Sequence, residues 1–144
     1  MSVVDRFFDA IRSEDARDRE ATAAGFDHLR GHKYALFVSY RRSGEPVPTP
    51  VWFGLDWDGR AFFRTDTRTA KVRRVRVNSA VKLAPCTLRG KPLGPFAPGT
   101  ARVLPAAGET HAEQALQANY GVGRKIYQGT AGSEQACYVE VTPA

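Results

Sequence analysis

A strand-like segment that runs into a hydroxyl-rich turn and a basic helix carries the residues best suited to bind an anion. Residues 62–71 read Phe-Phe-Arg-Thr-Asp-Thr-Arg-Thr-Ala-Lys. The exposed N–H groups and the dipole at a helix start favour a phosphate or a carboxylate. Thr65 and Thr69 can donate hydroxyl hydrogen bonds, and Arg64 or Lys71 can supply the countercharge. The segment predicts an anion site, with plain capping of the helix by threonine as the alternative.

Positive charge is concentrated around the same segment. The formal net charge is +6, whereas residues 64–91 alone contain nine basic side chains and one acid. This stretch therefore carries +8, and the rest of the chain sums to −2. Such a concentration attracts an anionic partner, which could be a phosphorylated cofactor, a nucleic acid or an acidic protein. A solvated basic surface is the alternative interpretation.

A second candidate is the proline-interrupted stretch over residues 48–52, Pro-Thr-Pro-Val-Trp. Its prolines prevent regular strand pairing and can leave backbone groups available to a planar ligand, on which Trp52 can stack. Burial of Trp52 in the core explains the residue equally well. The chain has no P-loop, nucleophile elbow, HExxH or CxxC sequence. An enzyme built on this chain would therefore depend on a cofactor for its chemistry.

Hydrophobic patterning predicts the elements that must position these residues. Aromatic and β-branched runs between turn signals predict six strands, over residues 34–40, 47–57, 61–65, 80–88, 100–104 and 136–142. Helical spacing predicts helices over residues 3–24, 26–32, 67–77 and 108–120, with residues 121–132 rich in turns. Pro48 and Pro50 place the second strand at a sheet edge or a bulge. The hairpin-like spacing favours an antiparallel barrel over βαβ units.

Composition is that of an ordinary globular protein. Hydrophobic residues make up 42% and charged residues 25% of the 144 positions, which fits one domain over residues 1–144. Within it we expect an N-terminal helix over residues 1–25 and a barrel over residues 33–144. The chain lacks an apolar run long enough for a membrane span, and its charged N-terminus does not resemble a secretory signal. Cys86 and Cys137 lie far apart without metal-ligand spacing, so we expect free thiols, no metal and a cytoplasmic location.

Several short sequences occur together between residues 34 and 104. They are GEPVPTPVWF at 44–53, RT at 64–65, TAKVRRVR at 69–76, VKLAPC at 81–86, RG at 89–90 and GTARVL at 99–104. In this order they resemble the deazaflavin-dependent branch of the pyridoxamine 5'-phosphate oxidase-like split β-barrels. The resemblance implies a mainly β (α+β) fold, a six-stranded antiparallel split β-barrel with flanking helices that forms a two-fold homodimer.

The same resemblance implies a cofactor at the subunit interface, typically coenzyme F420, with FMN in related branches. The residues expected to line its rings are Thr49, Pro50, Val51 and Trp52. Those expected to hold its phosphate and tail are Arg64, Thr65, Ala70, Lys71, Arg74 and Arg89. Related flavin-binding oxidases carry basic residues where this chain has Thr49, Gly54 and Ala70, and this departure favours F420 over FMN.

The first hypothesis is an F420-dependent oxidoreductase that transfers a hydride between the deazaflavin and a small organic substrate. A non-catalytic carrier of F420 or FMN, or an FMN-dependent pyridoxamine phosphate oxidase-like enzyme, is the alternative. A nucleic-acid-binding module based on residues 68–76 is a third hypothesis, which no RNP or helix-turn-helix signature supports, and we expect no nucleic-acid partner. The sequence assigns no catalytic residue.

Overall fold

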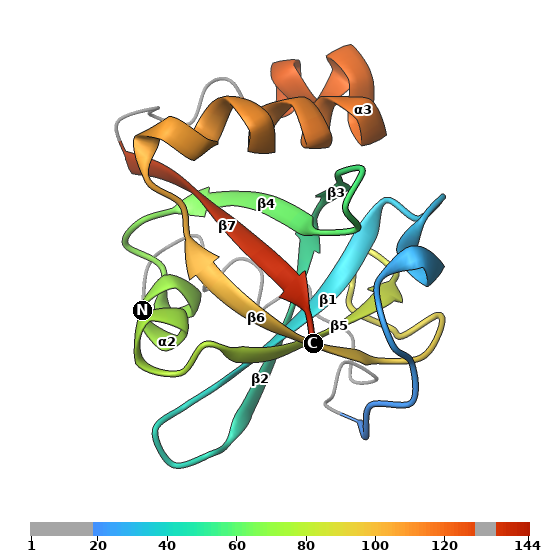
Figure 1. Ribbon diagram of the computed structural model, residues 1–144, viewed down its shortest axis with the longest axis vertical. Helices are drawn as coiled ribbons and strands as arrows, with labels where there is room; N and C mark the ends of the chain where they lie inside the picture. Colours follow the sequence, from blue (N-terminus) through green and yellow to red (C-terminus); the bar gives the residue numbers. More distant parts are fainter. Residues whose placement is uncertain (1–18, 129–134) are drawn as a thin grey trace.

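The computed structural model describes residues 19–128 and 135–144 (Figure 1). Its strands are β1 (Tyr34–Tyr40), β2 (Pro46–Trp52), β3 (Gly54–Leu55), β4 (Ala61–Asp66), β5 (Ala80–Cys86), β6 (Ala97–Val103) and β7 (Ala136–Pro143). Its helices are the 3₁₀ turns η1 (Asp27–Leu29) and η2 (Ala106–Gly108) and the α-helices α2 (Ala70–Val77) and α3 (Glu109–Gln128). None of the described helices is long and apolar enough to cross a membrane.

All seven strands belong to one antiparallel sheet in the order β2-β1-β5-β6-β7-β4-β3. β2 and β3 stand at opposite edges of this sheet, yet Phe53 alone separates them in the chain. Because one residue spans only about 3.5 Å, the two edges meet at Phe53 and the sheet must curl into a half-barrel (Figure 1).

The prediction of six strands is therefore wrong by one. The expected strand over residues 47–57 is two strands, β2 and β3. They are separated by the buried Phe53, where the chain changes from pairing with β1 to pairing with β4. The sheet thus differs from the predicted six-stranded split barrel in strand number and in its half-barrel form. Its antiparallel, mainly β character is confirmed.

The edge position predicted for the proline-rich strand is confirmed. β2 pairs with β1 alone, with Pro48 opposite Val38 and Pro50 opposite Leu36. Proline has no N–H, so the donors that bond to β1 come from the intervening residues, and the outer edge lacks donors at every proline. Such an edge resists the addition of a further strand.

Two helices lie against different parts of the sheet. In Figure 1, α3 lies across the outer side of β4 and β7, and α2 lies beside β6. The close approach of α3 depends on Gly54, where a Cβ would lie 2.2 Å from the Ala115 carbonyl oxygen. The sequence predicted that this helix ends at residue 120, but it continues to Gln128. The glycines at 121 and 123 were interpreted as a stop, although a helix tolerates each at a cost of about 1 kcal/mol.

The predicted N-terminal helix falls mostly on residues outside the described part of the chain. Its last positions, residues 19–24, are not helical. Ala21 forms a β-bridge with Phe96, and the N–H groups of Thr22 and Ala23 both donate to the Phe96 carbonyl at 3.0 Å. These tertiary hydrogen bonds replace the helical ones that the local pattern predicted.

Candidate functional site

The side chain of the N-cap residue does not cap the start of α2. Thr69 is the N-cap residue, but its hydroxyl donates to the Asp66 carbonyl at 2.9 Å and makes no capping bond to the helix. The first turn contains Lys71 and no acid. Cations at a helix N-terminus oppose the helix dipole. The local sequence therefore favours an anion at this end, and the Asp66 carboxylate is within electrostatic reach of Lys71.

A cavity of about 420 Å³ adjoins this helix and the β1–β2 hairpin. We call it the cationic cavity; its lining residues are Tyr40, Arg41, Arg42, Ala70, Arg73, Arg74 and Val77. Four of these residues are arginines and none is acidic, so the cavity carries a strong positive potential.

Several arginines of the cationic cavity are held by local hydrogen bonds. Arg74 donates from Nε to the hydroxyl of the fully buried Ser39 at 2.7 Å. Arg73 donates to the Arg68 carbonyl at 2.9 Å. Arg41 forms an exposed ion pair with Glu45 at 3.6 Å. The Arg74 bond fixes α2 against β1, so the cavity wall is anchored in the core.

The sequence placed Ala70 and Arg74 in the anion site, and both line the cationic cavity. It missed Arg41, Arg42 and Arg73. The two hairpin arginines were interpreted only as a polar turn. The sequence feature that could have indicated these arginines is a basic pair directly after a buried strand. The neighbouring residues do not show, however, that the turn folds toward α2.

Thr65 lies near the end of β4, and Lys71 lies in the first turn of α2. Neither residue lines the cationic cavity. The hydroxyl oxygens of Thr65 and Thr69 are 3.5 Å apart. Lys71 is only 4% exposed. The Arg68 hydrogen bond is the main reason that the pKa of Asp66 lies below its ordinary value, and the charge of Lys71 lowers it further.

The four residues expected at the cofactor rings lie on β2, on two different faces. Thr49 and Val51 pair with Phe37 and Ala35 and share their face, which is buried in the core inside the curl. Pro50 and Trp52 occupy the opposite face, where Trp52 lies tilted against Tyr34 with ring centroids 6.3 Å apart. A single planar ligand on one face of the strand could not contact all four side chains.

Arg89 is exposed in the turn between β5 and β6. That turn follows Cys86, which pairs with Tyr34 at the start of β1, whereas the cationic cavity adjoins Tyr40 at its end. The two ends of β1 are roughly 20 Å apart at strand spacing. The structure therefore does not bring Arg89 to the cationic cavity.

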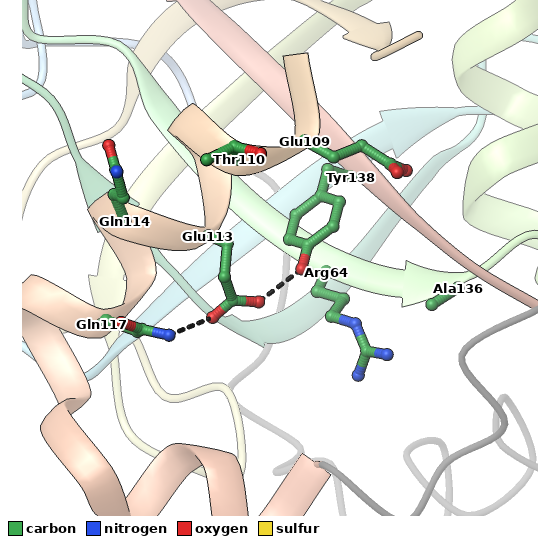
Figure 2. Close-up of a pocket in the computed structure, with 8 residues that line it drawn as sticks. All are labelled: Arg64, Glu109, Thr110, Glu113, Gln114, Gln117, Ala136 and Tyr138. Carbon is green, nitrogen blue, oxygen red and sulfur yellow. Dashed lines mark hydrogen bonds between the residues drawn. The ribbon is translucent and has the colours of Figure 1, made fainter. Parts of the chain in front are cut away.

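Arg64 lines a different cavity, shown in Figure 2. Side chains alternate along β4, so Arg64 shares the outer face with Phe62, which packs beneath α3, while Thr65 shares the inner face with Phe63. The sequence placed Arg64 and Thr65 around one phosphate, whereas the structure directs them to opposite faces of the strand.

We call this second cavity the α3 cavity. It has a volume of about 430 Å³. Its lining residues are Arg64, Glu109, Thr110, Glu113, Gln114, Gln117, Ala136 and Tyr138. The Tyr138 hydroxyl donates a short hydrogen bond to Glu113, and the Gln117 amide donates to the same carboxylate at 3.3 Å (Figure 2). Apart from Arg64, none of these residues was a sequence-based candidate.

An ionic network around the buried Asp56 and Glu140 carboxylates holds α3 beside the β3–β4 turn. His111 on the helix bonds to the Asp56 carboxylate at 2.9 Å, and Arg60 binds the same oxygen from Nε at 2.9 Å. Arg60 also reaches Glu140, which in turn accepts from Arg102 at 2.9 Å. Burial alone would raise the pKa of Asp56, but hydrogen bonds from His111 and Arg60 hold it below its ordinary value.

Neither cysteine is paired, and both are buried. Burial raises the pKa of the Cys86 thiol to about 12. It is also the main reason that the pKa of Cys137 is raised. A thiol is a poor nucleophile under these conditions, so the structure does not support cysteine chemistry at either position.

No protein-family model matches the chain, and no curated protein matches it. Solved structures do share its fold. An F420 reductase superposes with a TM-score of 0.61 at 19% identity, over 85% of this chain and 96% of that one. The heme storage protein HutZ from Vibrio cholerae gives a TM-score of 0.63 at 13% identity, over 82% and 86%.

A protein of unknown function from Agrobacterium tumefaciens has a similar structure, with a TM-score of 0.65 at 19% identity. The match covers 82% of this chain but only about half, 52%, of that protein. At these identities the likeness establishes the fold and nothing about activity.

Proposed function

We propose that the chain is an oxidoreductase that binds coenzyme F420 and transfers a hydride between it and a small organic substrate. The observation that carries the proposal is the cationic cavity between the β1–β2 hairpin and one face of α2, which four arginines and no acid line. The fold shared with an F420 reductase supports it. So does the sequence resemblance to deazaflavin-dependent split-barrel proteins.

The residues present fit the anionic end of this cofactor. A deazaflavin tail combines a phosphodiester with glutamate carboxylates, and guanidinium groups bind both in a bidentate manner. Arg42 and Arg73 would bind the tail from the hairpin and the helix. Arg74, fixed by Ser39, would position α2 rather than move to meet the ligand. The deazaflavin ring itself would supply the hydride chemistry when bound.

We propose that β2 provides the wall for the ring through the half-buried Trp52 on its outer face, with the buried Pro50 beneath it on the same face. Thr49 and Val51 would support this wall from the core side. Holding the ring against a rigid edge strand orients one face toward substrate and excludes water from the other. Trp52 is half-buried and rests on Tyr34, so its indole is already positioned for stacking.

We further propose that the protein acts as a cytoplasmic homodimer. β2 is an edge strand whose prolines disfavour strand addition, so a partner subunit would pack through side chains. A groove between subunits would cover the ring more completely than one chain can. Light scattering of the purified protein would test the dimer directly, and a monomer at micromolar concentration would refute it.

The central experiment titrates the protein separately with F420, FMN and hemin, following fluorescence for the first two and absorbance for hemin. We expect saturable binding of F420, weakened about tenfold by Arg73→Ala through loss of a charge-assisted contact. Arg30→Ala is the matched control, since Arg30 is an exposed arginine beyond the other end of β1. Lys71→Ala should also weaken F420 binding if its charge reaches the phosphate.

Each titration outcome is decisive for the cofactor. Preference for FMN would favour the flavin-oxidase alternative, and preference for hemin would indicate heme binding; either would overturn the F420 assignment. Equal losses with Arg73→Ala and Arg30→Ala would mean that net charge, not the cationic cavity, attracts the ligand. If F420 binds but no acceptor is reduced across a broad panel, the carrier alternative holds.

A further inference from the structure

The α3 cavity is a separate site from the cationic cavity. Arg64 on β4 and Tyr138 on β7 are cross-strand partners, so both side chains emerge on the outer face of the sheet beneath α3. Ala70 and Arg74 belong instead to the cavity between α2 and the β1–β2 hairpin. No residue lines both cavities. A ligand in one is therefore bound by different side chains from a ligand in the other.

The α3 cavity has the opposite charge balance. Its ionisable lining consists of Glu109 and Glu113 from the helix and Arg64 from the sheet, a formal charge of −1 in a chain whose net charge is +6. The cavity therefore does not suit the phosphates that the cationic cavity attracts. It suits a small molecule that carries more positive than negative charge.

The Glu113 carboxylate is held in a fixed orientation. Tyr138 is buried and donates its hydroxyl to one carboxylate oxygen, while the Gln117 amide donates to the other. Both donors keep the carboxylate turned toward the sheet, as Figure 2 shows. Tyr138 and Gln117 are thus positioning residues, and a preorganised carboxylate loses less freedom when it binds a cation.

Arg64 presents a different kind of group in the same cavity. In Figure 2 its guanidinium extends away from the Glu113 carboxylate rather than folding onto it. A planar guanidinium matches a carboxylate in a bidentate manner. Helix-dipole stabilisation can explain Glu109 in the first turn of α3, whereas Glu113 lies one turn later, where the hydrogen bond from Tyr138 joins the helix to β7.

We propose that the α3 cavity binds a cationic amino acid, such as free lysine or arginine. Arg64 would bind the α-carboxylate, Glu113 the α-ammonium and Glu109 the charged end of the side chain. The cavity volume of about 430 Å³ lies at the small end of the range for ligand sites, which fits a ligand of this size. The proposal does not depend on F420, because the site shares no lining residue with the cationic cavity.

The test is a calorimetric titration of the full chain, without cofactor, using L-lysine as the probe. L-Norleucine lacks the side-chain ammonium, and 1,5-diaminopentane lacks the carboxylate. We expect saturable binding of L-lysine that is at least about tenfold tighter than binding of either analogue, since each lacks one charge-assisted contact. Equal binding of all three, or no lysine binding up to 20 mM (roughly −2.3 kcal/mol), would overturn the proposal.

Variants distinguish this site from the general surface charge. Arg64→Gln should weaken L-lysine more than 1,5-diaminopentane, because only the amino acid has a carboxylate for the guanidinium to bind. Gln114→Lys should weaken both probes by adding a cation at an exposed position of the cavity rim, where a folding defect is not expected. Glu45→Gln, on the distant β1–β2 turn, is the matched control and should change neither.

Tyr138→Phe tests the positioning role. Loss of the hydroxyl would free the Glu113 carboxylate to rotate, so lysine affinity should fall about threefold to tenfold while the preference over norleucine persists. Loss of that preference, or an unchanged affinity in both Arg64→Gln and Gln114→Lys, would mean that lysine binds elsewhere. Circular dichroism melting would show whether any variant has lost α3 instead of the ligand contact.

Discussion

The cationic cavity and the α3 cavity have nearly the same volume, yet their chemistry is opposite. The first is lined by four arginines and no acid, and the second by two glutamates and one arginine. In the first, Arg74 is bonded to a buried hydroxyl and Arg73 to a backbone carbonyl. In the second, Tyr138 and Gln117 donate hydrogen bonds to the Glu113 carboxylate. The same sheet thus supports two sites that should select ligands of opposite sign.

The difference also explains why the sequence indicated two residues of the cationic cavity but only Arg64 of the α3 cavity. Most of the cationic cavity comes from one helix and one turn, where arginines cluster at short spacing. The α3 cavity combines residues from β4, α3 and β7. Arg64 on β4 lies 40 or more positions before the lining residues of the helix. Charge clustering can be read from a chain, but cross-strand register cannot. Sites assembled from distant segments therefore need the fold before they can be recognised.

The largest expected effect is at Gly54, where α3 packs on β3. It tests whether the α3 cavity can be disrupted without disrupting the cationic cavity. In Gly54→Ala the new Cβ would lie 2.2 Å from the Ala115 carbonyl oxygen and 2.4 Å from its carbon, both backbone atoms that move only with the helix. We expect destabilisation by about 3 kcal/mol, the upper part of the range for overpacking. Lysine binding should be lost with it, while F420 binding at the cationic cavity should persist. Urea unfolding and the two titrations measure these effects.

Gly108→Ala is the matched control for that helix. Its Cβ would lie 3.4 Å from Leu104, which is an ordinary contact, so stability should change by less than about 1 kcal/mol. Similar free energies of unfolding for the two variants would show that α3 does not press on β3 as described. Loss of F420 binding in Gly54→Ala alone would show that the two cavities are coupled.

Elements with a strong local signal were predicted well. The first strand over residues 34–40 matches β1 in full, because aromatic and β-branched residues fill a strand buried along most of its length. The basic helix was also found, although it begins at Ala70 and not at residue 67. Its start shifted because Asp66 still belongs to β4 and accepts the Arg68 N–H at 2.8 Å, which forms a turn before the helix.

Features set by tertiary contacts were missed. The change of edge at Phe53 and the extended residues 19–24 both depend on partners distant in sequence. The grouping of site residues failed for the same reason. Arg64 and Thr65 are adjacent in sequence but face opposite sides of a strand. Which of those sides lines a cavity depends on how the whole sheet folds.

A smaller effect is expected at Asp56, which holds α3 through His111. Because the pKa of Asp56 is lowered on folding, its contribution is present above its ordinary pKa near 3.8 and is lost as the pH falls through the lower folded value. Asp56→Asn should therefore cost about 1–2 kcal/mol at pH 5, and the difference from the unmodified protein should shrink at pH 2.5. Urea unfolding at both pH values measures it.

Asp58→Asn is the control, since this neighbouring carboxylate is 78% exposed. It should leave stability unchanged at both pH values. A constant penalty for Asp56→Asn from pH 5 to pH 2.5 would show that the carboxylate's charge does not stabilise α3. The helix would then be held by its apolar contacts with Phe62 and by the hydrogen bonds that Glu113 and Asn119 make.

The smallest effect concerns Glu45 and would sharpen the contrast between the cavities. Its exposed ion pair with Arg41, at 3.6 Å, partly neutralises one arginine of the cationic cavity. Glu45→Gln removes that countercharge, so F420 affinity should rise about twofold to threefold at low salt and the gain should vanish at high salt. Stability should change by less than about 0.5 kcal/mol, because exposed pairs contribute little. A fall in F420 affinity would mean that Glu45 orients Arg41 for binding rather than competing for it, and that this arginine acts through its geometry more than its charge.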